Sequence, residues 1–497
     1  METVYSIKPL AAILVSLVAV ILIALSRNRP NVRESWTILA SFAKFGIVLS
    51  MLPMVVQGVY PAITMFTIAP GISFALKVDS LGIMFGLSAS ALWILTSFYS
   101  IGYVRGLDEH KQSRYFGSFA ICLSATMGIA FAANLFTLVI FYEILTIATY
   151  PLVIHKETEE AIRAGRKYLV YLLTGGVFLL LALAFTYVYA GTTDFQPGGI
   201  LAADIAGGRV GLLFAFFLLS FGVKSAIMPL HSWLPSAMVA PTPVSALLHA
   251  VAVVKAGVFG FARAIGFIIG PELLHSSGAA NYLMCITAVT ILVASLIALR
   301  QDNLKARLAY STVGHLSYIV LGIAMLSPSA WMGGVLHIVN HAVMKITLFF
   351  CAGSIYVKTH CTEVSQLDGI GKQMPITMGA FALASLGLAG VPPVTGFISK
   401  WYLVQGSLSV GQSVLAATFL ISGVLNAGYF FSIVVRAFFR RSDTFTRFNE
   451  ASPFLVVPLA ITALLSLLLG LFPNQFPYFF DLARRIAGSV TGGGGLW

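Results

Sequence analysis

Six ionisable side chains stand inside long apolar stretches of this chain, where charge is otherwise rare. They are five lysines and one glutamate, namely Lys44, Glu143, Lys224, Lys255, Lys345 and Lys400. An ionisable group in hydrocarbon costs roughly 3 kcal/mol on insertion scales, so it normally faces a partner or a hydrated path within a helix bundle. Six such groups predict a route for charge through the interior of the protein.

Glu143 is the only acid clearly inside an apolar stretch. If it reaches Lys224, each ion favours the charged form of the other, and the pair can switch as a proton moves. The alternative is a structural role, in which a salt bridge or a protonated glutamate ties two helices together. Sequence alone leaves the distance between the two side chains open.

Lys224 and Lys400 lie in two similar segments, FGVKSAIMPLHSWLP over 221–235 and LAGVPPVTGFISKWYL over 388–403. Each segment holds prolines, and proline removes an intrahelical hydrogen bond. In a membrane, freed backbone groups are tolerated only where protein or water satisfies them, so we predict a broken helix lining a cavity at each lysine. Burial makes a lysine easier to deprotonate, which suits a proton relay.

The other strong candidates lie on two further stretches. His337, His341 and Lys345 are spaced by four and should stack on one helix face. Their alternative role is to hold helices together through polar contacts. His249 and Lys255 are six residues apart, so a regular helix would point them to different faces and only one would face the path.

Two groups are weaker candidates. His315, in YSTVGHLSYI, either extends the relay or is a hydrogen-bonded packing residue. Lys44 lies near the end of its predicted helix, where a lysine can snorkel to the interface. We therefore leave Lys44 out of the predicted site.

Membrane-spanning helices must position these groups. Of the 497 residues, 58% are hydrophobic and 10% charged, and the apolar residues form runs of about 20, enough to cross a bilayer. We predict an all-α polytopic membrane protein with about 14 transmembrane helices. The expected spans are 6–25, 36–58, 79–103, 114–132, 134–154, 166–189, 210–230, 241–268, 281–299, 307–326, 331–357, 375–405, 411–438 and 452–472.

The spans form one membrane domain, because no connection is long enough to fold alone. The predicted broken helices are the seventh and the twelfth, five spans apart. Two five-helix repeats would therefore run in opposite directions, the inverted pattern of secondary transporters. Within residues 1–497 we expect N-terminal helices 1–3 over 1–105, a first repeat of helices 4–8 over 114–268, a second repeat of helices 9–13 over 281–438, and helix 14 with a short tail over 452–497.

The basic residues predict the orientation. Placing both termini outside puts 19 of the 30 lysines and arginines in cytoplasmic connections, 6 outside, Arg263 among them, and 5 within spans, as the positive-inside rule favours. The first span resembles a retained anchor more than a cleaved signal peptide. We expect a multi-pass protein in the cytoplasmic membrane of a prokaryote.

The net charge of +12 is scattered through short loops. Lipid headgroups are therefore expected to contact it, and nucleic acid is not an expected partner. The four cysteines lack CxxC spacing, and no Rossmann or P-loop glycine pattern is present. We expect no metal, haem, flavin or nucleotide cofactor.

Four motifs resemble one known family. HSWLPSAMVAPTPVSALLHA, RLAYSTVGHLSYI, HAVMKITLFFCAGSIY and GLAGVPPVTGFISKW are similar to the antiporter-like subunits of respiratory complex I, Mrp antiporters and membrane-bound hydrogenases. The resemblance covers roughly residues 75–440. It implies fourteen core helices, inverted five-helix repeats, broken seventh and twelfth helices and a hydrated polar axis along the midplane.

The resemblance also implies roles for the candidate residues. Glu143 and Lys224 would be the acid–lysine pair of a first half-channel, and Lys255 or His249 the link on the eighth helix. Lys345 with His337 and His341 would form the central relay, and Lys400 the terminal lysine. Some family members carry glutamate at that last position, so that type of complex I subunit is a poorer match. The short tail favours a D-type Mrp subunit, a hydrogenase type or a related stand-alone module.

These observations predict a proton-translocating, antiporter-like subunit of a multisubunit membrane complex. An alternative is the D-type subunit of an Mrp Na⁺/H⁺ antiporter driven by the proton gradient, and another is a membrane coupling subunit for inorganic-carbon uptake. A structural scaffold with buried ion pairs is a further possibility. The chain shows no redox or hydrolytic site of its own. The driving reaction, sodium transport, partner subunits, stoichiometry and exit side stay open.

Overall fold

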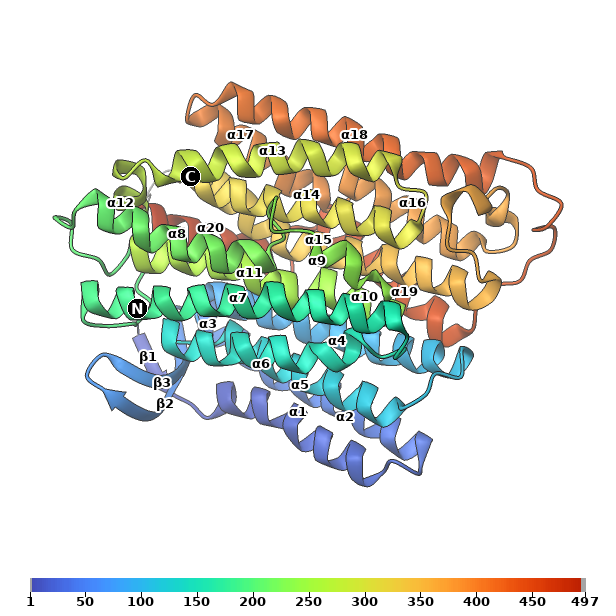
Figure 1. The fold of residues 1–497 in the computed structure, drawn as a ribbon, viewed down its shortest axis with the longest axis horizontal. Helices are drawn as coiled ribbons and strands as arrows, with labels where there is room; N and C mark the ends of the chain where they lie inside the picture. Colours follow the sequence, from blue (N-terminus) through green and yellow to red (C-terminus); the bar gives the residue numbers. More distant parts are fainter. Residues whose placement is uncertain (1, 493–497) are drawn as a thin grey trace.

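Long helices run side by side along the longest axis of the molecule, and a small β-sheet lies at one end of the bundle (Figure 1). The structure, a computed structural model, describes residues 2–492. Helices overlap every predicted span. In chain order they are α1 (Lys8–Leu25), α2 (Pro30–Leu49), α3 (Leu52–Val56), α4 (Ser80–Gly106), α5 (Gln112–Ala130), α6 (Leu135–Val153), α7 (Glu159–Ala190), α8 (Gly207–Lys224), α9 (Trp233–Ser236), α10 (Thr242–Ala246), α11 (Val253–Arg263), α12 (Pro271–Ser276), α13 (Ala279–Arg300), α14 (Leu304–Ala324), α15 (Pro328–Thr359), α16 (Pro375–Ala389), α17 (Gly396–Ser409), α18 (Ser413–Phe439), α19 (Pro453–Leu471) and α20 (Phe479–Thr491).

The helices have the composition of a membrane protein. Within residues 2–492, eleven helical segments are long and apolar enough to cross a bilayer. α5, α14 and the interrupted pair α16 and α17 are not among them. The polytopic helical class is thus confirmed, while the number of about 14 spans and the inverted repeats stay predictions.

A three-stranded sheet adds to the predicted all-α class. β1 (Glu2–Tyr5) pairs in parallel with β2 (Val59–Ala69), which pairs antiparallel with β3 (Ile72–Lys77). The strands are rich in β-branched and aromatic residues, which favour extended structure. Gly71 in the turn has φ +77°, a conformation that suits glycine. The predicted spans assign most of this segment only to a connection.

Both predicted helix breaks are present, beside their lysines. α8 ends at Lys224, and α17 begins four residues before Lys400. Side chains satisfy backbone groups that the breaks free: Trp233 Nε1 donates to the Val223 carbonyl at 2.8 Å, and Asn340 Nδ2 donates to the Thr395 carbonyl at 2.9 Å. Irregular backbone inside the membrane is tolerable because the protein itself satisfies it.

The eighth predicted span is not a regular helix. Between α10 and α11 lies a π-helical turn over Leu247–Val251, and a second follows α11 over Ala264–Ile269. The expectation for His249 and Lys255 assumes a regular helix, whereas the segment that carries them is irregular. A π-turn widens the helix locally and often marks a functional position.

Arg263, which the predicted topology counts among the outside charges, pairs with an acid. It lies at the end of α11 with its side chain buried, and its Nη1 is 2.5 Å from Asp79 Oδ2. Asp79 also caps the first turn of α4 by accepting from the Gly82 amide. The buried arginine is therefore neutralised by an acid, unlike the lysines of the spans.

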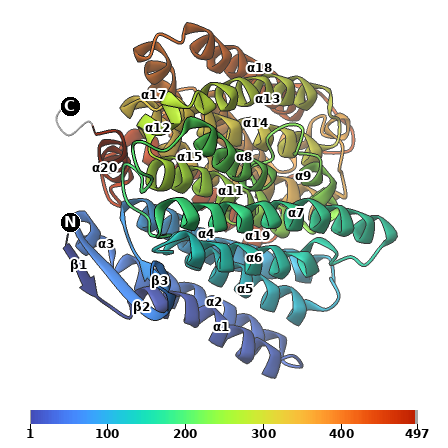
Figure 2. The same ribbon diagram turned by 60° about the vertical axis from the view of Figure 1, so that its left-hand side comes forward.

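α15 forms the centre of the molecule. It is buried along its length except near its C-terminal end, and it contacts α4, α14, α16, α17, α19 and α20. It runs through the middle of the bundle in both ribbon views (Figure 2). Most residues on this helix are thus shielded from lipid.

Candidate functional site

A chain of hydrogen-bonded side chains runs through the second half of the bundle. It begins at Lys345, whose Nζ donates to Ser311 Oγ at 2.8 Å. Tyr429 Oη lies 2.9 Å from that hydroxyl and 2.7 Å from Asn426 Oδ1. Asn426 Nδ2 lies 3.3 Å from His315 Nε2. All five side chains are buried.

The chain continues through two imidazoles. His315 Nδ1 is 3.1 Å from His337 Nε2, and His337 Nδ1 is 2.8 Å from Ser399 Oγ. Each ring therefore uses one nitrogen on either side, so a proton taken up at one nitrogen can be matched by release from the other. His315 lies at the centre of this arrangement.

Lys400 sits at the helix break next to the end of the chain. Its Nζ donates to the carbonyls of Leu388 and Ala389, at 2.5 and 3.2 Å. These carbonyls belong to the last turn of α16, whose helix dipole is negative there and favours a cation. Asn426 Nδ2 also lies 3.5 Å from the Leu388 carbonyl, which joins Lys400 to the network.

Lys255 approaches the same network from the other half of the molecule. Its Nζ is 3.0 Å from His341 Nδ1. The ring of His341 lies 5.4 Å from that of His315 and 5.9 Å from that of His337, measured between centroids. These contacts link a set of buried side chains, which we name the basic network. Its members are Lys255, Ser311, His315, His337, His341, Lys345, Ser399, Lys400, Asn426 and Tyr429.

His249 is buried but lies outside the basic network. Neither ring nitrogen has a hydrogen-bond partner, and the ring packs 4.8 Å from that of Phe349. The structure therefore brings Lys255, and not His249, to the basic network.

Glu143 and Lys224 lie on neighbouring helices without a direct ion pair in residues 2–492. Lys224 Nζ donates to the Tyr142 carbonyl at 2.7 Å and lies 3.2 Å from the centre of the Tyr142 ring. Glu143 is half-buried, and its Oε1 has no hydrogen-bond partner. Its carboxylate lies against Gly176 of α7, where a β-carbon would collide with it.

Lys44 does not snorkel, contrary to our expectation. It is fully buried, donates to the Leu123 carbonyl at 2.9 Å and lies 5.0 Å from the centre of the Trp93 ring. A carbonyl and an aromatic face together stabilise a buried ammonium. None of its hydrogen bonds leads to the basic network.

Sequence reasoning missed the neutral members of the network, which are Ser311, Ser399, Asn426 and Tyr429. A signal was present for two of them. Ser311 precedes His315 by four residues and so shares its helix face, and Asn426 is the only asparagine of an otherwise apolar span. Only the packing of α14 against α18 and α15 reveals the connection.

The electrostatics of the basic network favour shared protons. Three amines and three imidazoles gather there, and within residues 2–492 no carboxylate lies within ion-pairing distance of the three amines. Like charges at such distances in a low-dielectric interior repel strongly, so the six bases cannot all be protonated together. Because the network holds fewer protons than bases, a proton can transfer from one base to another.

The fold and this network define a class: a polytopic helical membrane protein with an interior line of bases. Residues 132–426 match the family described as NADH:quinone oxidoreductase/Mrp antiporter, TM. The chain therefore belongs to this family, as an antiporter-like membrane subunit.

Individual proteins that resemble this chain have names that agree with this family. NADH-quinone oxidoreductase subunit N of Desulforudis audaxviator (strain MP104C) is 32% identical over 412 residues, which cover 78% of this chain and 81% of the relative. Na(+)/H(+) antiporter subunit A1 of Staphylococcus aureus (strain JH9) is 30% identical over 433 residues, 81% of this chain. The match covers only 53% of that longer relative.

Solved structures share the fold. The membrane-bound sulfane sulfur reductase (MBS), an archaeal respiratory membrane complex, contains a chain that superposes with a TM-score of 0.88 at 24% identity, covering 98% of both chains. A chain of the Mrp complex from Dietzia sp. DQ12-45-1b gives 0.86 at 21% identity, also covering 98% of both.

Proposed function

We propose that this chain translocates protons along a midplane line of buried Glu, Lys and His side chains, as a subunit of a larger membrane complex. The observation that carries the proposal is the basic network, in which six buried bases gather without a neighbouring carboxylate. Hydrogen bonds connect Lys345, His315, His337 and Lys400, and the Lys255–His341 pair adjoins them through ring contacts of His341. The proposed path comprises Glu143, Lys224, Lys255, His337, His341, Lys345 and Lys400, with His315 as a further member. His249, which has no hydrogen-bond partner among the described residues, would join the path only through water.

The atoms of the second half suggest how a proton moves. A protonated Lys345 can pass a proton through the hydroxyls of Ser311 and Tyr429, since a hydroxyl both donates and accepts. The amide of Asn426 orients its neighbours but does not titrate, so it is a positioning residue. Carrying the proton from Tyr429 past this amide requires a water molecule, after which His315 and His337 relay it toward Ser399, beside Lys400.

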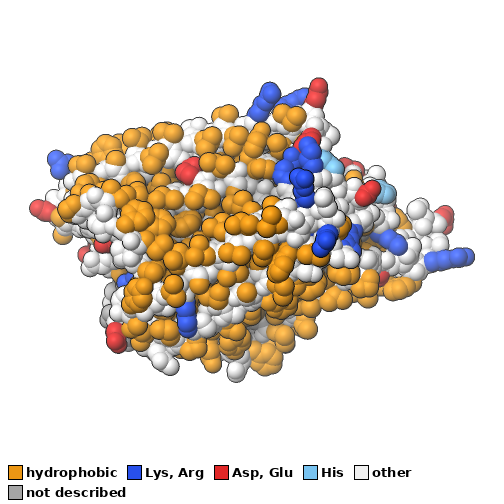
Figure 3. All heavy atoms as spheres, turned by 90° about the horizontal axis from the view of Figure 1, so that it is seen from below, with side chains coloured by type: hydrophobic (Ala, Val, Ile, Leu, Met, Phe, Trp, Pro, Cys, Tyr) orange, Lys and Arg blue, Asp and Glu red, His pale blue; other side chains and the backbone are white. Residues whose placement is uncertain are grey.

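Water access at one end supports uptake from that side. A cavity of about 470 Å³ is lined by charged and hydroxyl groups, including Lys156, Glu160, Lys305 and Tyr103. Tyr103, Glu160 and Lys305 lie at the ends of α4, α7 and α14, and Lys156 lies in the connection between α6 and α7. The positive-inside rule assigns this end of the bundle to the cytoplasm. On the face seen in Figure 3, a broad apolar belt covers the bundle and most lysines and arginines gather toward this end.

We place the chain in the cytoplasmic membrane of a prokaryote, with both termini outside. Its proposed partners are other membrane subunits, because the relatives are named as subunits of multisubunit complexes. Helices 4–8 and 9–13 are proposed as the two inverted repeats, supported by the matching breaks at Lys224 and Lys400.

A second candidate is Na⁺/H⁺ antiport, which the name of subunit A1 suggests. The basic network repels cations, so sodium would need another route while protons use this one. Dependence of transport on external sodium separates the two candidates.

Proton uptake by inside-out vesicles tests the proposal directly. With the complex assembled, Lys345→Ala should abolish uptake, because it removes the amine at the start of the hydrogen-bonded chain. Lys44→Met is the matched control, since Lys44 is as deeply buried but lies outside the network. Normal uptake by a correctly assembled Lys345→Ala variant would overturn the proposal.

A further inference from the structure

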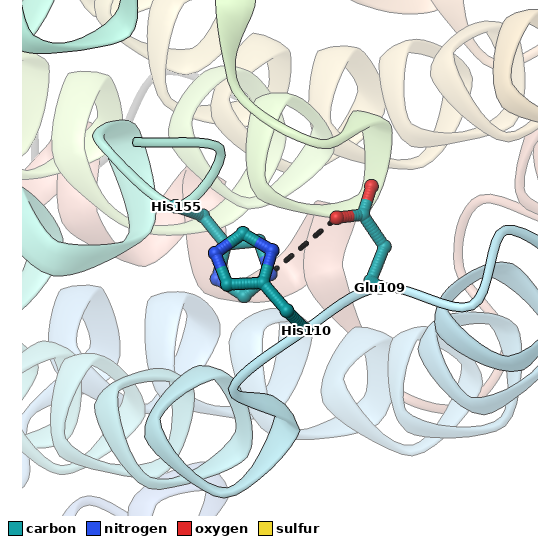
Figure 4. Close-up of side chains that lie close together, drawn as sticks. All are labelled: Glu109, His110 and His155. Carbon is teal, nitrogen blue, oxygen red and sulfur yellow. Dashed lines mark ion pairs between the residues drawn. The ribbon is translucent and has the colours of Figure 1, made fainter. Parts of the chain in front are cut away.

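Three metal-ligating side chains meet outside the membrane-spanning helices. Glu109 and His110 belong to the connection between α4 and α5, and His155 follows α6. Their ligating atoms all lie within 4.8 Å of one another. Figure 4 shows the rings of His110 and His155 overlapping, with the Glu109 carboxylate directed toward them.

His155 is the most informative of the three. Its side chain is 0% exposed, yet neither Nδ1 nor Nε2 has a hydrogen-bond partner. An unsatisfied buried polar group is costly, roughly 1–3 kcal/mol, and buried polar atoms almost always have partners. A ligand at this position would satisfy the ring nitrogen that faces Glu109.

The contact between His155 and Glu109 has a spacing that suits two ligands of one ion. The two closest atoms, His155 Nε2 and Glu109 Oε2, are 3.6 Å apart, near the roughly 3.3 Å that separates two ligands of a tetrahedral Zn²⁺.

The surroundings allow a cation to approach. Glu109 and His110 line an open cavity of about 360 Å³. His110 is exposed, and its Nε2, now 3.8 Å from Glu157 Oε2, would turn from there toward an ion. The nearby cations Lys111 and Arg114 are held by Glu157, at 2.7 and 2.6 Å. Glu157 thus offsets one of these two positive charges, and Lys156, which also lines the cavity, adds another that a bound metal would have to outweigh.

We propose that Glu109, His110 and His155 form a binding site for Zn²⁺ or a similar divalent transition metal. Two imidazoles and a carboxylate suit zinc, with a fourth position for water. The ion would tie the α4–α5 connection to the α6–α7 connection at the basic end of the molecule. The site lies apart from the basic network, and its existence is independent of the proposed function.

Zinc titration of the purified full-length chain tests the site. The chain should carry an affinity tag without histidine, and binding is measured by competition with a fluorescent chelator. We expect one Zn²⁺ per chain, and at least about tenfold weaker binding in His110→Ala and in Glu109→Gln. Both changes lie in the connection between α4 and α5, outside the helices.

His275→Ala is the matched control, because His275 is exposed and has Glu272 one turn away on α12. It should leave zinc binding unchanged. Absence of stoichiometric zinc binding by the wild-type chain, or unchanged affinity in His110→Ala and Glu109→Gln, would overturn the proposal.

A second measurement addresses the buried ligand. His155→Phe keeps a ring of similar volume, and folding is checked by thermal unfolding without metal. Zinc should raise the unfolding temperature of the wild-type chain, since a ligand that binds only the folded state stabilises it. A rise of equal size in the folded His155→Phe variant would contradict ligation by His155.

Discussion

The two halves of the molecule hold their buried charges differently. In the second half, side chains from α14, α15, α17 and α18 form one connected network from Lys345 to Ser399. In the first half, Glu143 and Lys224 occupy separate positions, and Lys224 is bound to a carbonyl and an aromatic ring. No hydrogen bond among described side chains connects that pair to Lys255.

This difference separates two ways of moving a proton. Connected hydroxyls and imidazoles let a proton move by small rearrangements of hydrogen bonds, with water needed only where the amide of Asn426 intervenes. Separated groups require water or a side-chain rotation at each step. We therefore expect the first half to be the gated part of the path and the second half to be the conducting part.

The largest effect is expected from charge removal in the connected half. His337→Ala interrupts the line between His315 and Ser399, and proton uptake by vesicles should fall about a hundredfold, within the usual range for lost proton transfer groups. His360→Ala controls for general effects, because His360 is exposed at the end of α15. If His337→Ala keeps more than a tenth of the wild-type uptake rate, water carries protons past the interrupted hydrogen bonds.

A smaller loss, about tenfold, is expected for Glu143→Gln, because the separated first half already depends on water. Gly176→Ala should have a similar effect, since its methyl group would displace the carboxylate. Gly211→Ala is the control, as that position has open space around it. If Gly176→Ala acts through Glu143, a variant that carries both Gly176→Ala and Glu143→Gln should take up protons no more slowly than Glu143→Gln alone. Uptake rates measured in parallel test this expectation.

A loss of a few-fold is expected for Tyr429→Phe, which removes the hydroxyl between Ser311 and Asn426 and leaves the ring in place. Tyr99→Phe provides the comparison, since that buried hydroxyl bonds only to the Phe350 carbonyl, outside the network. Equal uptake rates in the two variants would remove Tyr429 from the path.

The smallest effect on transport is expected for Arg263→Met, although its effect on stability is large. Arg263 is paired with Asp79, and removing one partner of a buried pair typically costs about 3–5 kcal/mol. The unfolding temperature in detergent should therefore drop, while proton uptake per assembled complex stays near normal. A proportional loss of uptake would place the pair on the path.

The sequence was most informative where a charge interrupts an apolar run. Lys224, Lys345 and Lys400 stand out against their spans, and the prolines beside two of them indicate the helix breaks. Family resemblance added the roles of these residues. The helical class and the breaks were predicted correctly on this basis.

What stayed hidden depends on contacts between distant segments. Neutral Asn426 and Tyr429 look unremarkable in sequence and matter only because α18 packs beside α14. The π-turn before Lys255 produces no recognisable periodicity of apolar residues in the sequence. Lys44 looked free to reach the interface, but the burial of its helix side against α4 and α5 keeps it inside.

The enclosed position of α15 has a mechanical consequence. Its 32 residues span about 48 Å, more than the hydrocarbon thickness of roughly 30 Å, and neighbours surround it on several sides. This helix cannot tilt without displacing many of the helices that surround it. Rocking of whole bundles, as in alternating-access carriers, is thus disfavoured, and the moving parts are expected to be protons, waters and single side chains.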